Sequence, residues 1–292
     1  MTESSVQQGA EIPAYISLVS GAFSGVIARL FVAPVDVIKI RMQLQSNARL
    51  YGTITSTIST IWKNEGFTAF WKGNVSAEIM YLIYGSAQFT SYSFLNTHLS
   101  RFEKKHSMNI PTAIHSLTIG AIAGCAATCS SYPFDLLRTR LISNEKPRFV
   151  SLYREIKDIL VASGCRGFFG GGFLSVLSVA LTTGFSFAGY NVLKGATFGT
   201  LFEPTSGLIA GALSKFLVYP LDLLKRRRQI TTSCTVSQAA VGIFQKEGLR
   251  GFYHGLIPSI VKSAPTTMLS LYFYELASGQ LLRMEESKRL NA

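Results

Sequence analysis

Pro34-Val35-Asp36-Val37-Ile38-Lys39-Ile40-Arg41 is an octapeptide that returns twice along the chain. The other two versions are Pro133-Phe134-Asp135-Leu136-Leu137-Arg138-Thr139-Arg140 and Pro220-Leu221-Asp222-Leu223-Leu224-Lys225-Arg226-Arg227. Each version has an acid two residues after the proline and bases five and seven residues after it. The prolines are 99 and 87 residues apart. A pattern that returns three times at nearly constant spacing indicates three repeats of roughly one hundred residues.

Two further elements recur with the same period. Glu65-Gly66 through Trp71-Lys72-Gly73 returns as Glu247-Gly248 through Tyr253-His254-Gly255. The middle copy, Ser163-Gly164 through Phe169-Gly170-Gly171, lacks both charges. Before each proline lies a Gly-x-x-x-Gly pair, namely Gly21 and Gly25, Gly120 and Gly124, and Gly207 and Gly211. In apolar helices this spacing favours close packing of two backbones.

Each repeat contains two long apolar segments around a polar stretch. The first segments lie near residues 14–44, 113–142 and 205–229, and the second near 74–99, 172–198 and 256–282. Each is long enough to cross a hydrocarbon layer of about 30 Å as a helix. Shorter stretches near 53–64, 152–162 and 236–246 have apolar residues at helical spacing, as in helices that lie along a membrane surface. The sequence predicts an all-α membrane protein with six transmembrane helices in three pseudo-symmetric repeats and short amphipathic surface helices.

The predicted organisation has five parts. They are an N-terminal tail (1–13), three repeats (14–103, 113–199 and 204–283) and a C-terminal tail (284–292). An even number of spans places both ends of the chain on one side of the membrane.

Composition supports a membrane setting. Only 15% of the 292 residues are charged, against about 25% in soluble globular chains, and the mean hydropathy is +0.28. The net charge of +12 suits nucleic acid, anionic lipid or an anionic solute. The bases are scattered apart from Lys225 to Arg228, so we expect anionic lipid and an anionic solute as partners, and no nucleic acid.

The sequence shows little sign of other chemistry. Its four cysteines and four histidines lack the spacing of metal ligands, and we expect neither a metal nor a cofactor. Residues 1–13 contain no Lys or Arg, unlike a transit peptide, so any targeting signal is expected to be internal. No nucleophile–base pair or phosphate-cradling glycine loop stands out, and we expect no enzyme.

The triplicated Pro-x-Asp-x-x-Lys/Arg-x-Lys/Arg, followed by Glu-Gly and Trp-Lys-Gly, resembles the signature of the mitochondrial carrier family. The resemblance runs from about Ala14 to Leu282. Four strings are similar to the fungal thiamine pyrophosphate carriers within that family: Phe70-Trp71-Lys72-Gly73-Asn74, Tyr84-Gly85-Ser86-Ala87-Gln88-Phe89, Ser131-Tyr132-Pro133-Phe134-Asp135 and Pro265-Thr266-Thr267. The resemblance implies a monomeric multi-pass antiporter of the mitochondrial inner membrane, with both termini toward the intermembrane space.

The acid and first base of each signature place six opposite charges at one depth in the membrane. Ionisable groups there cost about 3 kcal/mol each on insertion scales, so we expect them to be paired or functional. Three helices around one axis can form three ion pairs: Asp36 with Arg138, Asp135 with Lys225, and Asp222 with Lys39. Such a ring closes the pore at one end. A pair at 4 Å is worth about 4 kcal/mol at an effective dielectric of 20, which substrate binding can offset. The alternative is that the bases extend to lipid headgroups.

The resemblance implies that this ring is the gate on the matrix side. It also implies a glutamine brace two residues beyond the second base. Gln43 and Gln229 match this position, whereas Ile142 occupies it in the middle repeat, so we expect two braces.

A second gate, on the cytosolic side, is implied on the even-numbered helices as aromatic-acid-x-x-base. The copies are Tyr92-Ser93-x-x-Asn96, Tyr190-Asn191-x-x-Lys194 and Tyr274-Glu275-x-x-Ser278. Only Lys194 and Glu275 keep their charges, so at most one ion pair can form. We expect this gate to be weak and the empty carrier to be open to the cytosolic side.

Between the gates we expect a cavity with three cations. Arg29 and Lys215 each lie seven residues before a signature acid and share its helix face, whereas Thr128 is the uncharged third member. The resemblance implies contact positions at Met80-Tyr81, Ser178-Val179 and Lys262-Ser263. Convergence of Arg29, Lys215 and Lys262 on one polyanion suits a diphosphate, because Arg gives bidentate contacts and Lys a point charge. The alternative for this cluster is contact with lipid headgroups.

Other residues complete the predicted site. Met80, Tyr81 and Tyr84 offer a surface for a flat heterocycle. Glu78 either faces a cationic ring or neutralises Arg29. By resemblance, the helix starts at Gly73, Gly171 and Gly255 hold the phosphate of a cardiolipin-like lipid through backbone amides.

The expected function is exchange of a thiamine-pyrophosphate-like anion by alternating access. The alternative is the same kind of carrier with another nucleotide or phosphate-bearing cofactor as its substrate. A non-transporting membrane adaptor would predict eroded signatures, yet all three acids and six bases are present.

Overall fold

The computed structural model describes residues 14–44, 53–106, 111–147, 150–196, 203–231 and 235–290, and all secondary structure in these ranges is helical. Each repeat has a long helix, a short surface helix, a 3₁₀ turn and a second long helix. The first long helices are α1 (Ala14–Leu44), α5 (Thr112–Ser143) and α8 (Glu203–Ile230). The surface helices are α3 (Ile54–Glu65), α6 (Leu152–Ser163) and α9 (Val236–Glu247). The second long segments are α4 (Asn74–His106), α7 (Gly172–Ala196), and α10 (Leu256–Val261) followed by α11 (Ser263–Leu290). The all-α prediction is confirmed.

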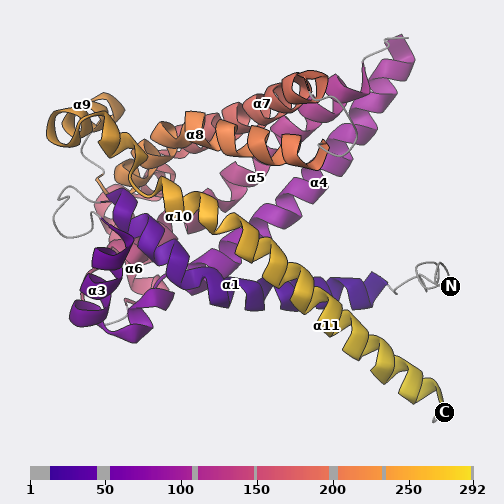
Figure 1. Ribbon diagram of the computed structural model, residues 1–292, viewed down its shortest axis with the longest axis horizontal. Coiled ribbons are helices and arrows are strands. Elements are labelled where there is room, and N and C mark those ends of the chain that lie inside the picture. The colour runs from indigo at the N-terminus through magenta and orange to yellow at the C-terminus, as the bar shows by residue number, and fades with distance from the viewer. Residues whose placement is uncertain are drawn as a thin grey trace.

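Within the described residues, four stretches of helix are long and apolar enough to cross a membrane by length and composition. They are Tyr15–Leu44, Ile114–Ser143, Cys165–Leu193 and Ser206–Ile230. The helices α4 and α11 are as long as the others but contain more polar residues. Figure 1 shows that α1 begins and α11 ends on one side of the molecule, whereas α3, α6 and α9 lie on the other.

The last long segment differs from the single helix expected near 256–282. It breaks at Lys262, between α10 and α11. Pro265 is the physical reason, because proline has no N–H with which to bond the carbonyl of Val261 four residues earlier. The break places Lys262 at the end of α10.

The signature prolines lie inside helices α1, α5 and α8. Pro34 cannot bond the carbonyl of Leu30, and the indole N–H of Trp71 donates to that carbonyl at 3.0 Å instead. In the third repeat, the ring of Tyr253 stacks on Phe216, four residues before Pro220, with centroids 4.8 Å apart. The aromatic residue before each Lys-Gly or His-Gly therefore packs beside a proline kink.

The three first helices contact one another pairwise, and each also packs against a second helix: α5 against α4, α8 against α7, and α1 against α11. Glycines with positive φ allow these approaches. Gly73 (φ +74°), Gly171 (φ +87°) and Gly255 (φ +81°) precede the second helices. A Cβ at each would lie 3.0 Å from an oxygen of a neighbouring first helix, closer than ordinary contact. These glycines therefore have a packing role, and their contact with lipid phosphate stays a prediction.

The Gly-x-x-x-Gly pairs do not pack as expected. An added Cβ at Gly124 would lie 3.3 Å from Val179, but the other five glycines have open space within 4 Å. These glycines lie before the signature in α1, α5 and α8. In those parts of the helices, the contacts with neighbouring helices are made by other residues. The expected close approach is therefore wrong for five of the six positions.

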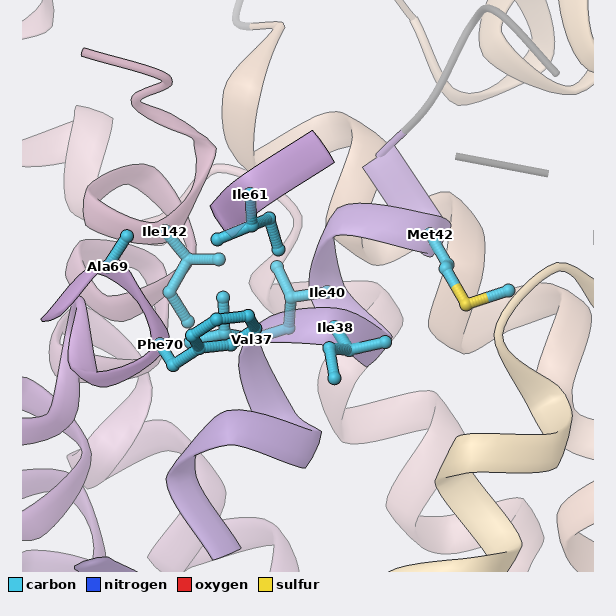
Figure 2. Packing of buried hydrophobic residues seen from close by; sticks show 8 residues of the cluster. All are labelled: Val37, Ile38, Ile40, Met42, Ile61, Ala69, Phe70 and Ile142. Carbon is cyan, nitrogen blue, oxygen red and sulfur yellow. The ribbon is translucent and has the colours of Figure 1, made fainter. Parts of the chain in front are cut away.

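The surface helices are anchored to the signature segments by buried apolar side chains. Figure 2 shows Val37, Ile38, Ile40 and Met42 of α1 packed with Ile61 of α3, with Ala69 and Phe70 of the 3₁₀ turn that follows α3, and with Ile142 of α5. The cluster joins the first repeat to the end of α5 in the second. Corresponding clusters pack Ile159 of α6 against α5 and Ile243 of α9 against α8, so each surface helix packs against the signature segment of its own repeat.

Candidate functional site

The signature acids and bases meet where α1, α5 and α8 contact one another. Asp36 on α1 lies 2.6 Å from the guanidinium of Arg138 on α5. Its other oxygen accepts a hydrogen bond from Lys262 at 2.7 Å. The first expected pair is present, and Lys262 faces inward to join it.

Asp135 on α5 has the largest set of partners. Lys225 on α8 lies 2.8 Å away and Arg226 lies 2.9 Å away. Gln229 donates to the second oxygen of Asp135 at 3.0 Å, as a brace would. Arg226 also donates to Thr139 at 2.5 Å and to the amide oxygen of Gln229 at 3.1 Å. The role of Arg226 was missed, because only the extra base in the third signature distinguishes it in the sequence.

The third expected pair is absent. Asp222 is bound by Lys215 of its own helix, and in the described part of the chain no carboxylate lies within 4 Å of the Lys39 amine. Lys215 lies two helical turns before Asp222 and reaches it without help from α1. The nearby charges of Lys39 are mostly cations, among them Lys215, Lys262 and Arg226. Competition from these cations for the carboxylates explains the missing pair.

Gln43 also differs from a simple brace. Its amide donates to the hydroxyl of Tyr219 at 3.0 Å, and that hydroxyl donates to the carbonyl of His254 at 2.7 Å. Gln43 therefore ties α1 to α8 and to the start of α10 through neutral hydrogen bonds, with no contact to Asp222.

The second bases of the signatures form an outer ring that the sequence analysis did not assign. Each donates to a backbone carbonyl at the end of the next first helix in cyclic order. Arg41 reaches Asn144 at 3.0 Å, Arg140 reaches Gln229 at 3.2 Å, and Arg227 reaches Gln43 at 3.3 Å. A guanidinium at a helix C-terminus satisfies free carbonyls and the negative end of the helix dipole.

Each of these arginines also pairs with a glutamate of its own repeat. The distances are 2.8 Å from Arg41 to Glu65, 3.7 Å from Arg140 to Glu155 and 2.7 Å from Arg227 to Glu247. Glu65 and Glu247 are the last residues of α3 and α9, whereas Glu155 lies in the first turn of α6, so the middle repeat supplies its acid from the other end of the surface helix. The Glu-Gly signal and the second base thus belong to one cluster.

Two adjoining cavities, of about 190 and 290 Å³, lie beside the ring and share Tyr84, Ser175, Val179 and Lys225 as walls. The smaller cavity is also lined by Met80, Tyr81, Thr128, Ser131, Tyr132 and Asp135. The larger is also lined by Ser178, Thr182, Thr183, Lys215 and Asp222. Helices α4, α5, α7 and α8 therefore line an open space with both polar and apolar walls, which reaches the two ring acids Asp135 and Asp222.

The three expected cavity cations do not converge. The guanidinium of Arg29 lies 3.6 Å above the ring of Tyr81 and 3.4 Å from Glu78, so Glu78 neutralises it. Lys215 binds Asp222 and Lys262 binds Asp36. Each cation thus has a different carboxylate, which explains the separation. The side chain of Ser263 lies outside the described residues.

The cytosolic-gate pair is not described, because the side chain of Lys194 lies outside the described residues. Glu275 is exposed. Asn96, at the position of a gate base, lies 3.1 Å from His115, whose other ring nitrogen is 2.6 Å from Glu103. These contacts join α4 to α5.

Among the described residues, no three His, Cys, Asp or Glu side chains gather as metal ligands.

Comparison with known proteins gives one consistent result. The mitochondrial carrier protein family matches residues 10–103, 110–201 and 197–285. The mitochondrial thiamine pyrophosphate carrier 1 of Lodderomyces elongisporus is 40% identical, over 94% of this chain and 93% of that protein. The protein of that name from Meyerozyma guilliermondii is 41% identical over 94% and 96%. The one from Saccharomyces cerevisiae strain S288c is 34% identical over 94% and 96%.

Proposed function

Because the chain belongs to the mitochondrial carrier protein family, we propose that it exchanges thiamine pyrophosphate, or a related phosphorylated thiamine or nucleotide anion, across the mitochondrial inner membrane. Identities of 34–41% over nearly the whole chain to carriers named for thiamine pyrophosphate support this substrate. The protein works as a multi-pass monomer with both termini toward the intermembrane space, and it makes or breaks no covalent bond.

One observation carries this proposal: acids and bases of all three repeats meet at the junction of α1, α5 and α8. Charges at this depth are costly unless they are paired or functional. In the proposed cycle the pairs between helices, Asp36–Arg138 and Asp135–Lys225, are the matrix gate, and they part when the substrate has bound from the cytosolic side. The helices then rock about the fixed central site.

The charges around the cavity suit an anionic substrate. Among the described residues, seven cations surround the site: Arg29, Lys39, Arg138, Lys215, Lys225, Arg226 and Lys262. Four carboxylates balance them in part: Asp36, Glu78, Asp135 and Asp222. Seven cations against four carboxylates leave three positive charges for a substrate to neutralise. A diphosphate is a polyanion and meets this requirement.

The few contacts among the second helices of the three repeats suit an empty carrier that is open to the cytosolic side. No appreciable contact joins α4, α7 and α11 to one another in the described part of the chain, whereas α1, α5 and α8 contact one another. Anionic lipid of the cardiolipin type is a proposed partner at the helix starts after Gly73, Gly171 and Gly255.

Reconstitution tests the function directly. The purified protein is placed in liposomes loaded with thiamine pyrophosphate, and uptake of labelled thiamine pyrophosphate is measured against empty liposomes. We expect uptake that depends on internal substrate. If nucleotides exchange and thiamine pyrophosphate does not, the alternative of a nucleotide or other phosphate-bearing cofactor holds. If no anion exchanges in a well-folded preparation, a membrane adaptor becomes the better reading.

A further inference from the structure

A separate pocket of about 270 Å³ lies where the ends of α1 and α8 meet α9, and it shares no lining residue with the two central cavities. In Figure 1, α9 is on the side of the molecule away from both chain ends. None of the described residues that line this pocket is acidic, and three of them are bases: Arg227, Arg228 and Lys246. The rest of the wall is largely apolar and includes Leu44, Ile230 and Ile243. The pocket therefore combines positive charge with apolar surface.

Three residues of this pocket differ in kind from their counterparts in the other two repeats. The surface helices have 12 residues each, so their positions correspond one to one. The position of Arg228 holds Met42 and Leu141, that of Gly242 holds Thr60 and Asp158, and that of Lys246 holds Asn64 and Ala162. Departures from the repeat pattern that are far apart in the sequence therefore meet at one place, which indicates a feature of the third repeat alone.

Gly242 lies in the middle of α9, where glycine weakens a helix more than any residue except proline. No packing contact requires it, because an added Cβ would meet no atom of a neighbouring element within 4 Å. The missing side chain instead keeps the pocket open between Gln238 and Lys246, which lie about one helical turn to either side of it.

The positive charge of the pocket is only partly balanced. Arg227 lies 2.7 Å from Glu247. The guanidinium of Arg228 donates to the carbonyl of Thr231 at 2.9 Å, which holds it at the end of α8. Lys246 is exposed, and no described carboxylate lies within 4 Å of its amine. The adjoining segments 45–52 and 232–234, which lie outside the described residues, contain no Asp or Glu. Three bases against one carboxylate leave two positive charges for a ligand.

We propose that this pocket binds a phosphate group, either of a small anion in the aqueous phase or of a lipid headgroup, through Arg228 and Lys246 in the space left open at Gly242. An arginine can bond two phosphate oxygens at once, and a lysine adds a point charge. The volume is slightly below the range of about 300–1,000 Å³ for small-molecule sites, so it suits a group of about the size of a diphosphate.

The position of the pocket separates it from the proposed exchange route. Arg227 also donates to the carbonyl of Gln43 at 3.3 Å, so a bound phosphate would lie beside the contact between α8 and α1. The site does not depend on which substrate the carrier exchanges, and its test needs no transport.

The test follows the amine of Lys246 in the purified full-length protein in detergent. Its acylation by an amine-reactive ester is measured by peptide mass spectrometry, with and without inorganic pyrophosphate. At a pyrophosphate concentration about ten times its dissociation constant, the acylation rate of Lys246 should fall about tenfold. Lys63, an exposed lysine on the surface helix of the first repeat, is the internal control and should change by less than about twofold. Pyrophosphate in the central cavities does not cover Lys246, so the signal is specific to this pocket.

Two variants introduce the residues that the first repeat has at these positions. Arg228→Met and Gly242→Thr should each raise the dissociation constant obtained from the protection data about tenfold. Gly242→Thr should fold at least as well as the wild type, because the space beside it is open and threonine is a better helix former than glycine. Arg250→Met removes an exposed base outside the pocket and is the matched control, which should leave the constant within about twofold.

The source of the phosphate is identified by repeating the measurement in micelles that contain cardiolipin or phosphatidylcholine. Protection by pyrophosphate supports an aqueous anion, and protection by cardiolipin alone supports a lipid phosphate. If Lys246 reacts equally with and without pyrophosphate and cardiolipin, the inference is overturned. Protection that stays unchanged in both variants would overturn it too.

Discussion

Arg226→Met and Lys39→Met are a pair of substitutions for which the structure predicts an order that the signature does not. Lys39 is the first base of its repeat, whereas Arg226 lies between the two signature bases. A reading of the sequence would therefore rank Lys39 as essential and Arg226 as dispensable. In the structure Arg226 binds Asp135 at 2.9 Å, and Lys39 has no carboxylate within 4 Å among the described residues.

The expected cost of losing Arg226 follows from its contacts. At 2.9 Å the gross Coulomb energy is about 6 kcal/mol at an effective dielectric of 20. Most of this is cancelled by desolvation of two charges that are 14% and 9% exposed. Asp135 also keeps Lys225 and Gln229. A hydrogen bond to a charged group is worth about 1.5–3 kcal/mol net, so we expect a loss of about 2 kcal/mol, or roughly thirtyfold in the equilibrium between the closed and open forms of the proposed gate.

Lys39→Met should cost much less, because it removes a cation from a group of cations and leaves no carboxylate without a partner. Replacing such a charge by an apolar side chain is commonly neutral or stabilising. The assay is thermal unfolding of the purified variants in detergent, where about 2 kcal/mol corresponds to a fall of roughly 4 °C. Accessibility of a cysteine placed on the matrix side of the ring reports gate opening independently. A larger fall for Lys39→Met than for Arg226→Met would refute the reasoning.

Three further predictions test other parts of the site. Glu78→Gln should lower the inhibition constant of pyrophosphate several-fold, because it frees the charge of Arg29. It should raise the inhibition constant of thiamine, because it removes a charged acceptor for the ring of the substrate. Changes of both constants in the same direction would contradict this role of Glu78. Gly255→Ala should destabilise the protein by about 2–3 kcal/mol more than Gly248→Ala in denaturation assays. Both glycines have positive φ, but only at Gly255 would an added Cβ lie within 3.0–3.2 Å of other atoms, which belong to Tyr219, Gln43 and Lys39. His254→Lys should raise the melting temperature by a few degrees. At the same position of the first repeat Lys72 forms an ion pair with Glu65, whereas His254 lies 3.2 Å from a Glu247 oxygen that has no hydrogen-bond partner in the described chain. An unchanged or lower melting temperature would show that the two repeats differ here.

Much of the architecture could be predicted from the sequence, because the repeats and the lengths of the apolar segments are visible over long stretches of the chain and do not depend on single contacts. Six long helical segments and three surface helices follow from them, and the kink prolines mark where the first helices meet. The pairs Asp36–Arg138 and Asp135–Lys225 follow from the cyclic order of three similar helices. These inferences need only the order of the elements.

The remaining features depend on distances of a few ångströms. Sequence spacing placed Lys215 on the face of Asp222, but it did not show that Lys215 would displace Lys39 from that acid. The separation of Arg29 from the other cavity cations depends on Glu78, whose role was left open between two alternatives. The unpaired hydroxyl of Ser178 is visible only as the absence of a bond that its neighbours make. Competition among partners of similar strength decides the first two cases, and the third depends on side-chain positions that the sequence does not give.

The three contacts between α1, α5 and α8 are unequal, and this has a consequence for the way in which the proposed gate would open. The seam between α1 and α5 holds an ion pair, and the seam between α5 and α8 holds two with a glutamine. At the seam between α8 and α1, the contacts are a glutamine–tyrosine bond and an arginine–carbonyl bond. We therefore expect the three helices to separate unequally. The contact between α8 and α1 should break first and the contact between α5 and α8 last, so that the opening lies off the central axis.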